Sequence, residues 1–284
     1  MHAVRDVVVA IDNDEFSTDL YKILPEMLKS DLRLIPLKNK YKKPQRWGKD
    51  TVVFYCGTVG ENWGPDFLED GIGGAEEAVI YLSRELSKLG YDITVYNDRK
   101  EEHKDGDYNV LYKPWYDFDI RDQFSTVVVW RMPEFAKAVN AKHIFVDLHD
   151  VLDAPRVYDV VDIVDKILVK SEYHRSLFPE VPDEKIAVIS NGIIREQFAG
   201  DKEKEPNTVG YYSAPNRGLK MLLELWPQIK ERVPEAKGHW NYGWDSYIRV
   251  NGKDSLYQDI KKLFSEVKDF EEGKRISHER QAEK

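Results

Sequence analysis

Four short apolar runs in the middle of the chain constrain its fold more than any other feature. They cover residues 126–130, 143–148, 166–170 and 185–189. Strands that are buried on both faces have such near-continuous apolar runs, which are typical of parallel sheets covered by helices. Two earlier apolar runs, 52–55 and 92–96, flank a helical pattern over 74–89, and Gly90 follows that pattern as a helix C-cap. The alternation predicts an α/β fold with a doubly wound, Rossmann-like parallel sheet.

Composition narrows the class of protein. The net charge of −9 argues against a nucleic-acid-binding protein, whose footprint would be basic. The only cysteine, Cys56, fits a reducing compartment and lies in a predicted strand, where we expect it to be buried. No apolar run approaches the roughly 20 residues that span a membrane. These features predict a cytoplasmic protein and leave open a peripheral association with a membrane.

The alternating pattern of predicted strands and helices is interrupted and then resumes late in the chain. The charged, proline-ended stretch 201–206 is interpreted as a linker. We therefore expect a Rossmann-like domain over 51–200, a second one over 207–284, and an extension of unknown role over 1–50. The second domain has 78 residues, fewer than the roughly 100 typical of a domain, and is expected to be partial.

A glycine-rich loop, residues 71–79, joins the run at 52–55 to the helical pattern. Gly73 and Gly74 would present backbone N–H groups at the positive end of a helix dipole, which suits a phosphate. A dinucleotide fingerprint is an alternative, with Asp98 as the acid that binds the ribose, but Glu76 stands where a third glycine is required. A tight turn without a ligand is the remaining alternative.

Two polar residues follow predicted strands at the carboxyl edge of the sheet, where open α/β sheets bind ligands. His149 could donate a hydrogen bond to an anion or a hydroxyl group, or could bind a backbone carbonyl in its loop. Arg131 could face a phosphate or could pair with Glu134. In the second domain, residues 213–218 repeat the strand–turn–helix pattern.

Arg217, in the turn of the second domain, has the chemistry for a bidentate contact to a diphosphate. The alternative is a surface arginine at a helix start. The positive end of the helix dipole disfavours a cation there unless an anion is also bound.

Several motifs, taken in order, resemble glycosyltransferase family 4, whose members are retaining sugar-nucleotide transferases with the GT-B fold. They lie at residues 71–76, 146–149, 169–174, 188–193 and 212–219. The resemblance covers roughly residues 51–284 and implies a GT-B-like chain of two Rossmann-like domains. It implies that His149 is catalytic and that Glu76 and Arg131 lie on the acceptor side. The implied donor and phosphate contacts are Gly73, Gly74, Ser213, Arg217 and Gly218.

The resemblance also implies the chemistry: a sugar passes from a nucleotide-sugar to a hydroxyl group of a glycan, lipid or small molecule. The family uses no cofactor, and the sequence has no cluster that suggests a metal ligand set. The sequence differs from the family's motifs at three points. Ile194 occupies a usually acidic position, Ser213 stands where a base is common, and the family's E-x7-E element is absent. The absent element indicates truncation in the donor domain. The alternative function is therefore a non-catalytic remnant, or one that needs a partner chain to cover the partial domain.

Overall fold

The computed structural model describes residues 43–198 and 204–277 of the chain. The chain separates into two compact units, which are described one at a time. Of the described residues, the first unit comprises 43–64 and Ala78–Asn191, and the second comprises Pro65–Glu77 and those from Gly192 onward. Most of the predicted 1–50 extension and part of the predicted 201–206 linker lie outside the described residues.

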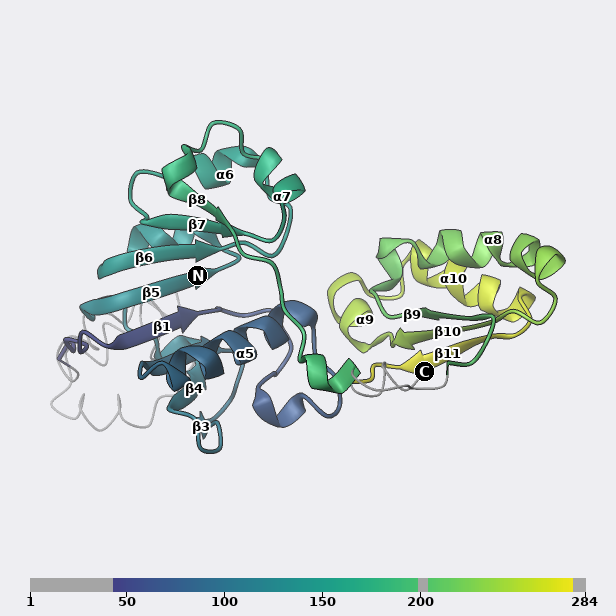
Figure 1. Ribbon diagram of the computed structural model, residues 1–284, viewed down its shortest axis with the longest axis horizontal. Coiled ribbons are helices and arrows are strands. Elements are labelled where there is room, and N and C mark those ends of the chain that lie inside the picture. The colour runs from purple at the N-terminus through teal and green to yellow at the C-terminus, as the bar shows by residue number, and fades with distance from the viewer. Residues whose placement is uncertain (1–42, 199–203, 278–284) are drawn as a thin grey trace, which may run out of the picture. The chain divides into compact units, whose positions relative to one another are not determined.

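The first unit is built on one sheet of eight strands, in the order β3-β4-β2-β1-β5-β6-β7-β8 (Figure 1). The strands are β1 (Thr51–Tyr55), β2 (Asp92–Asn97), β3 (His103–Lys104), β4 (Val110–Pro114), β5 (Phe124–Trp130), β6 (Ala141–Asp147), β7 (Lys166–Val169) and β8 (Ile186–Val188). Every pairing is parallel except that of β3 with β4. The chain builds outward from β1 in one direction and then, from β5, in the other. This confirms the predicted doubly wound α/β fold, whose ligand crevice lies where the strand order reverses.

One long helix, α5 (Gly74–Lys88), joins β1 to β2, at the position that the helical pattern predicts. Gly90 has φ +94 and ends the helix, because this left-handed conformation is easily adopted only by glycine. The later connections are shorter than full crossover helices. These connections contain only short helices: η3 (Trp115–Asp117), η4 (Pro133–Ala138), α6 (Ala154–Tyr158), α7 (Glu172–Ser176) and η5 (Asp183–Lys185).

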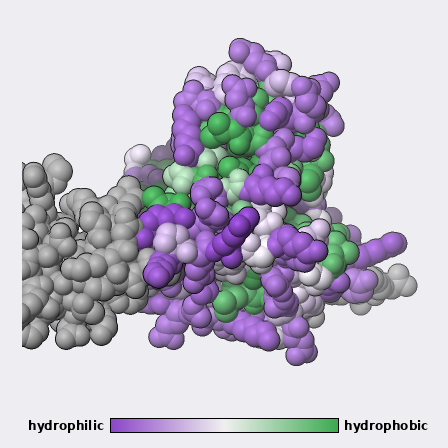
Figure 2. Space-filling model, turned by 90° about the vertical axis from the view of Figure 1, so that its left-hand side faces the viewer, coloured by the Kyte–Doolittle hydropathy of each residue, from purple (hydrophilic) through white to green (hydrophobic). Residues whose placement is uncertain are grey.

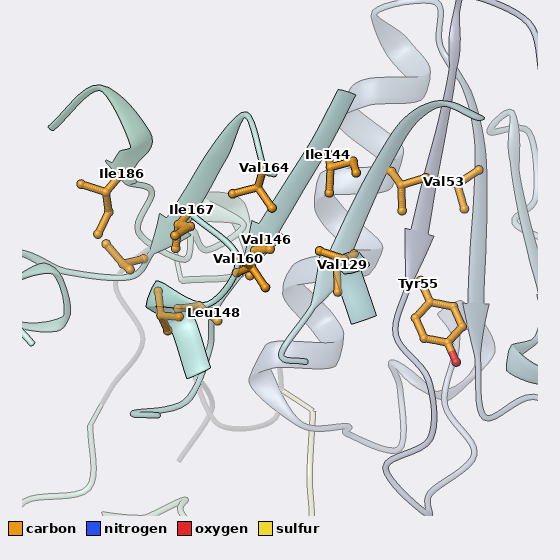
Figure 3. Close-up of a cluster of buried hydrophobic side chains, with 14 of the residues drawn as sticks. Val53, Tyr55, Val129, Ile144, Val146, Leu148, Val160, Val164, Ile167 and Ile186 are labelled. Carbon is orange, nitrogen blue, oxygen red and sulfur yellow. The ribbon is translucent and has the colours of Figure 1, made fainter. Parts of the chain in front are cut away.

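The core of the first unit forms because its central strands are buried on both faces. Consecutive residues of β1, from Val52 to Tyr55, are all buried, although their side chains alternate between the two faces. Figure 3 shows the core on one face, where β1, β5, β6 and β7 contribute Val53, Val129, Val146 and Ile167. The predicted burial of Cys56 is confirmed. The outer surface seen in Figure 2 is mostly hydrophilic, with smaller hydrophobic patches between the hydrophilic residues.

The segment just before β1 packs onto the first unit. The Trp47 indole donates a hydrogen bond to Asp122 at 3.0 Å, and its ring centroid lies 5.3 Å from that of Phe124. The Gln45 amide donates to the same carboxylate at 2.8 Å. The described end of the 1–50 segment is therefore held to the amino end of β5.

The second unit contains a three-stranded parallel sheet in the order β11-β10-β9. Its elements are η2 (Pro65–Phe67), η6 (Arg195–Phe198), β9 (Thr208–Tyr211), η7 (Pro215–Arg217), α8 (Leu219–Arg232), β10 (Lys237–Tyr242), α9 (Asp245–Asn251), α10 (Ser255–Glu266) and β11 (Phe270–Lys274). This succession of parallel strands and connecting helices is one βαβαβ half of a Rossmann fold. Figure 1 shows α8 and α10 together over one face of the sheet.

Aromatic residues dominate the core of this small unit. Trp226 and Trp240 are fully buried between the helices and the sheet. The Trp226 indole donates to the carbonyl of Lys268 at 2.8 Å, and the Trp240 indole donates to the carbonyl of Ser213 at 2.9 Å. The Trp240 bond ties the central strand to the turn that follows β9.

Candidate functional site

In the first unit, the strand order reverses between β1 and β5, and Arg131 is the residue that follows β5. Its φ of +66 is in the left-handed region, which is unusual for a residue other than glycine. The Arg131 amide donates to the carbonyl of Asp147, the last residue of the neighbouring strand β6, at 2.9 Å. This bond holds the turn after β5 against the end of β6.

The Arg131 side chain does not make the pair with Glu134 that was the alternative to a phosphate contact. Its Nε lies 2.7 Å from Oδ2 of Asp150, and the guanidinium carbon lies 4.3 Å from the Trp130 ring centroid. Glu134 instead accepts hydrogen bonds from Arg156. Arg131 and Asp150 thus form a partly exposed pair beyond the ends of β5 and β6.

A buried charge network lies at the same edge. Asp147 ends β6, and its carboxylate accepts from Lys170 Nζ at 2.5 Å through one oxygen. Its other oxygen lies 3.1 Å from Nε2 of His149. The His149 side chain is only 2% exposed, and its ring lies 5.8 Å from the Trp130 ring centroid. The predicted candidate His149 therefore lies next to an acid that fixes its ring orientation.

Two opposing effects act on Asp147. Burial raises the pKa of this carboxyl group, because it disfavours the charged form. The hydrogen bond with His149 and the positive charge of Lys170 act in the other direction and lower the pKa overall. Asp147 is therefore held as a carboxylate that can orient His149.

His174 is a second buried histidine next to this network. Ser171 caps the start of α7 by accepting from the His174 amide at 3.0 Å, and the Lys170 amide lies 3.4 Å from Nδ1 of His174. Burial lowers the pKa of His174 below its usual value of 6.5. The fold therefore favours the neutral ring.

The burial of His174 predicts a pH dependence of stability. In the unfolded chain this histidine gains its proton near pH 6.5, before it does so in the folded protein. Its contribution is complete above pH 6.5 and is lost as the pH falls from 6.5 to the lower folded pKa. We expect a smaller loss in His174→Gln than in the wild type, measured by urea unfolding at a series of pH values from 7.5 to 5. Equal losses in the two proteins would contradict this assignment.

The glycine-rich loop has a carboxylate folded over its end. Gly73 lies directly before α5, and its carbonyl accepts from the Glu77 amide at 2.9 Å. The Glu76 carboxylate occupies the space in which a Cβ on Gly73 would stand. A glutamate at the third helical position commonly reaches back in this way. A phosphate at Gly73 and Gly74 would therefore have to displace this carboxylate.

Asp98, the candidate for a ribose-binding acid, has a different role in the fold. Its carboxylate accepts from the amides of Val59 and Gly60, the latter at 2.8 Å. It therefore fixes the loop that follows β1. Together with Glu76 at the third position of the fingerprint, this arrangement disfavours the dinucleotide alternative.

In the second unit, Ser213, Arg217 and Gly218 lie in one turn between β9 and α8. Gly218 has φ +116 and precedes α8, and among residues 43–198 and 204–277 no side chain caps the first amides of this helix. Arg217 is exposed, and within the described part of the chain no carboxylate pairs with it. The turn thus presents a guanidinium and uncapped helix amides together, a combination that can bind an anion.

Tyr211, the last residue of β9, lies under this turn. Its hydroxyl is 3.9 Å from the point where a Cβ on Gly218 would stand. Burial raises the pKa of Tyr211, while Ser213 and the charge of Arg217 act in the opposite direction. Tyr211 therefore contributes a neutral hydroxyl beside the guanidinium.

The structure groups the predicted residues into three local sets. His149 and Arg131 lie at one edge of the first sheet. Ser213, Arg217 and Gly218 share one turn of the second unit, and Gly73, Gly74 and Glu76 lie at the start of α5. The sequence interpretation missed the partners Asp147, Lys170 and Asp150. A charged residue inside the apolar run 143–148 was the available signal for Asp147, since buried charges require partners.

Two further observations concern metals and membranes. Residues 43–198 and 204–277 contain no group of three or more histidine, cysteine, aspartate or glutamate side chains that could hold a metal ion. In the same ranges, no helix is both long enough and apolar enough to cross a membrane.

The arrangement defines a class of fold: a doubly wound sheet of eight strands and a second unit that contains half of a Rossmann sheet. A doubly wound sheet followed by a second Rossmann-like unit is typical of the GT-B fold, which glycosyltransferases share. No protein-family model matches the chain, and no curated protein matches it in sequence.

Solved structures of glycosyltransferases share the fold. The Anabaena protein HepE, solved with UDP and glucose, is 13% identical with a TM-score of 0.50 over 80% of this chain and 70% of its own. Sucrose-phosphate synthase from Thermosynechococcus elongatus is 12% identical, with a TM-score of 0.57 over 84% and 72%. A glycosyltransferase from Rickettsia africae is 14% identical, with a TM-score of 0.50 over 81% and 69%.

Proposed function

We propose that the protein is a retaining glycosyltransferase of the family 4 type, which transfers a sugar from a nucleotide-sugar to an acceptor hydroxyl group. The observation that carries this proposal is the turn between β9 and α8, where Arg217 and the uncapped start of α8 lie together. A donor diphosphate has the charge and shape that a guanidinium and helix amides bind. The fold supports the proposal, because HepE shares it and was solved with UDP and glucose.

In the proposed reaction, the bond between the anomeric carbon and the diphosphate oxygen breaks, and the diphosphate leaves with the bonding electrons. The acceptor oxygen forms its bond to the anomeric carbon on the same face. The acceptor proton passes to an oxygen of the leaving diphosphate. Arg217 and the amides at the start of α8 stabilise the negative charge that develops on the leaving group. The donor contacts are completed by Ser213 and Gly218.

On the acceptor side, His149 is proposed to position the acceptor hydroxyl or to contact the donor sugar. Asp147 orients the His149 ring, because its carboxylate binds Nε2. Since the side chain is buried in this conformation, contact with a substrate requires the His149 loop to move. Arg131 lies at the same edge and is proposed to contact the acceptor, which is a glycan, a lipid or a small molecule.

The start of α5 is proposed to contribute Gly73 and Gly74 to the donor phosphate site. The Glu76 carboxylate, which now covers Gly73, would swing outward when the diphosphate binds and then accept a hydrogen bond from the acceptor. The mechanism requires no cofactor, since the cations and helix amides of the chain supply the charge stabilisation.

Calorimetric titration with a panel of nucleotide-sugars tests the proposal. We expect the wild type to bind at least one donor, and Arg217→Ala to bind it about 10- to 100-fold more weakly, the loss expected for a charged hydrogen bond. Arg232→Ala is the matched control, because Arg232 is exposed at the far end of the same helix. If the wild type binds no donor, the proposed enzymatic function is refuted. The alternative, a partner-dependent or non-catalytic remnant, is then favoured. Unchanged affinity in Arg217→Ala would remove Arg217 from the site.

A further inference from the structure

A second arginine lies at the carboxyl edge of the small sheet. Arg275 directly follows β11, the strand on the far side of β10 from β9. Its guanidinium carbon lies 4.5 Å from the ring centroid of Tyr242, and one guanidinium nitrogen donates to the Ser246 hydroxyl at 3.1 Å. Tyr242 ends β10 and Ser246 lies in the first turn of α9. The positive charge of Arg275 is therefore held over the end of the central strand.

The strand order places Arg275 and the turn that contains Arg217 at the same edge of the small sheet, on either side of β10. Tyr242 pairs with Lys274 on one side of β10, and Trp240 pairs with Tyr211 on the other. Neighbouring strands are about 4.8 Å apart, so the strands that precede Arg217 and Arg275 are separated by about 10 Å. The guanidinium of Arg275 reaches from its own strand toward β9, because its contacts with Tyr242 and Ser246 lie on the intervening segment.

The backbone between the two arginines is kept bare by a glycine. Gly243 follows β10 with φ +78, a conformation that other residues rarely adopt. A Cβ at this position would have only backbone atoms of Lys274 and Arg275 as neighbours within 4 Å, the nearest at 3.6 Å. The edge beyond β10 thus has a bare peptide next to Arg275.

We propose that Arg275 is the second cation of the donor diphosphate site, opposite Arg217. This assignment rests on the proposed function. A diphosphate carries more than one negative charge, whereas the β9–α8 turn supplies one guanidinium, and Ser213 contributes only a neutral hydroxyl. Arg275 supplies the missing positive charge from another strand. The Tyr242 ring and the Ser246 hydroxyl orient the guanidinium before the ligand binds.

Calorimetric titration of the full chain with inorganic pyrophosphate and with nucleoside mono- and diphosphates tests the assignment. We expect Arg275→Ala to weaken pyrophosphate and nucleoside diphosphate binding about 10-fold, Arg275→Lys to recover part of the loss, and Arg232→Ala to bind as the wild type does. An equal loss for the monophosphate and the diphosphate would overturn the assignment, since Arg275 would then contact another part of the nucleotide. Unchanged pyrophosphate affinity in Arg275→Ala would also overturn it.

The thermal unfolding midpoint and a nucleotide-sugar titration separate the remaining explanations. A purely structural Arg275 would lower the midpoint without a selective loss of diphosphate affinity, which would overturn the assignment. Nucleotide-sugar binding that is unaffected by Arg275→Ala would refute the role of Arg275 and leave the proposed function intact. Arg275-dependent pyrophosphate binding in a protein that binds no nucleotide-sugar would refute glycosyl transfer and support the diphosphate site.

Discussion

Replacement of Asp147 by asparagine should destabilise the first unit by about 2–4 kcal/mol, somewhat less than the roughly 3–5 kcal/mol for breaking a fully buried ion pair from one side. The Asp147 carboxylate is buried and binds both Lys170 and His149. Asparagine has almost the same shape but no charge, so the Lys170 ammonium would lose its counter-ion in a site that is only 19% exposed. The partial exposure of Lys170 keeps the expected loss below the largest values known for such changes.

Amide hydrogen exchange in β6 and β7 measures this effect locally, because it reports the opening free energy of each segment. Asp159→Asn is the matched control: its pair with Lys137 is exposed, and exposed pairs contribute about 0–1 kcal/mol. A loss below about 1 kcal/mol in Asp147→Asn would show that the network is not an important source of stability.

The lowered pKa of Asp147 gives the sign of the accompanying acid effect. The stability that its carboxylate provides is complete above the usual value of 3.8 and is lost as the pH falls through the lower folded pKa. The difference in stability between the wild type and Asp147→Asn should therefore shrink only below about pH 4. A difference that disappears already near pH 6 would assign the effect to a histidine instead.

Replacement of Trp240 by alanine should destabilise the second unit by about 3–5 kcal/mol, the range for truncation of a buried tryptophan. Trp240 is fully buried, and its ring centroid lies 4.9 Å from that of Trp244 and 6.0 Å from that of Phe264. Small domains are stable by only about 5 kcal/mol, so this loss would leave the second unit with a stability of about 0–2 kcal/mol. The turn containing Ser213 would also lose its bond to the indole.

Trp240→Phe is the control for this prediction, because it keeps a ring in the core and removes only the hydrogen bond and part of the volume. We expect a loss of about 1–2 kcal/mol for it. Hydrogen exchange in β9, β10 and β11 should report both losses, while exchange in β1 and β5 stays unchanged. A loss below about 1.5 kcal/mol in Trp240→Ala would mean that the core refills the cavity.

The central strands and the long helix could be predicted from the sequence because their signals are local. The apolar run at 126–130 falls within β5, and Gly90 ends α5 as predicted. Three residues of the predicted donor set also lie together, because Ser213, Arg217 and Gly218 are neighbours in the sequence and share one turn. The hydrogen bonds of Asp98 and the position of Glu76 over Gly73 could not be predicted in the same way. Each depends on the conformation of a flexible side chain that ends in a carboxylate.

The sequence by itself therefore determined the class of fold, the positions of the central strands and the residues that end up at strand ends. Hydrophobic period and glycine conformation act over a few residues, so they can be read along the chain. Only the tertiary structure decided which strand ends become neighbours. It paired Asp147 with Lys170, 23 positions later, and placed Arg275 over Tyr242, 33 positions earlier. These contacts depend on strand order and register, which many distant side chains fix together.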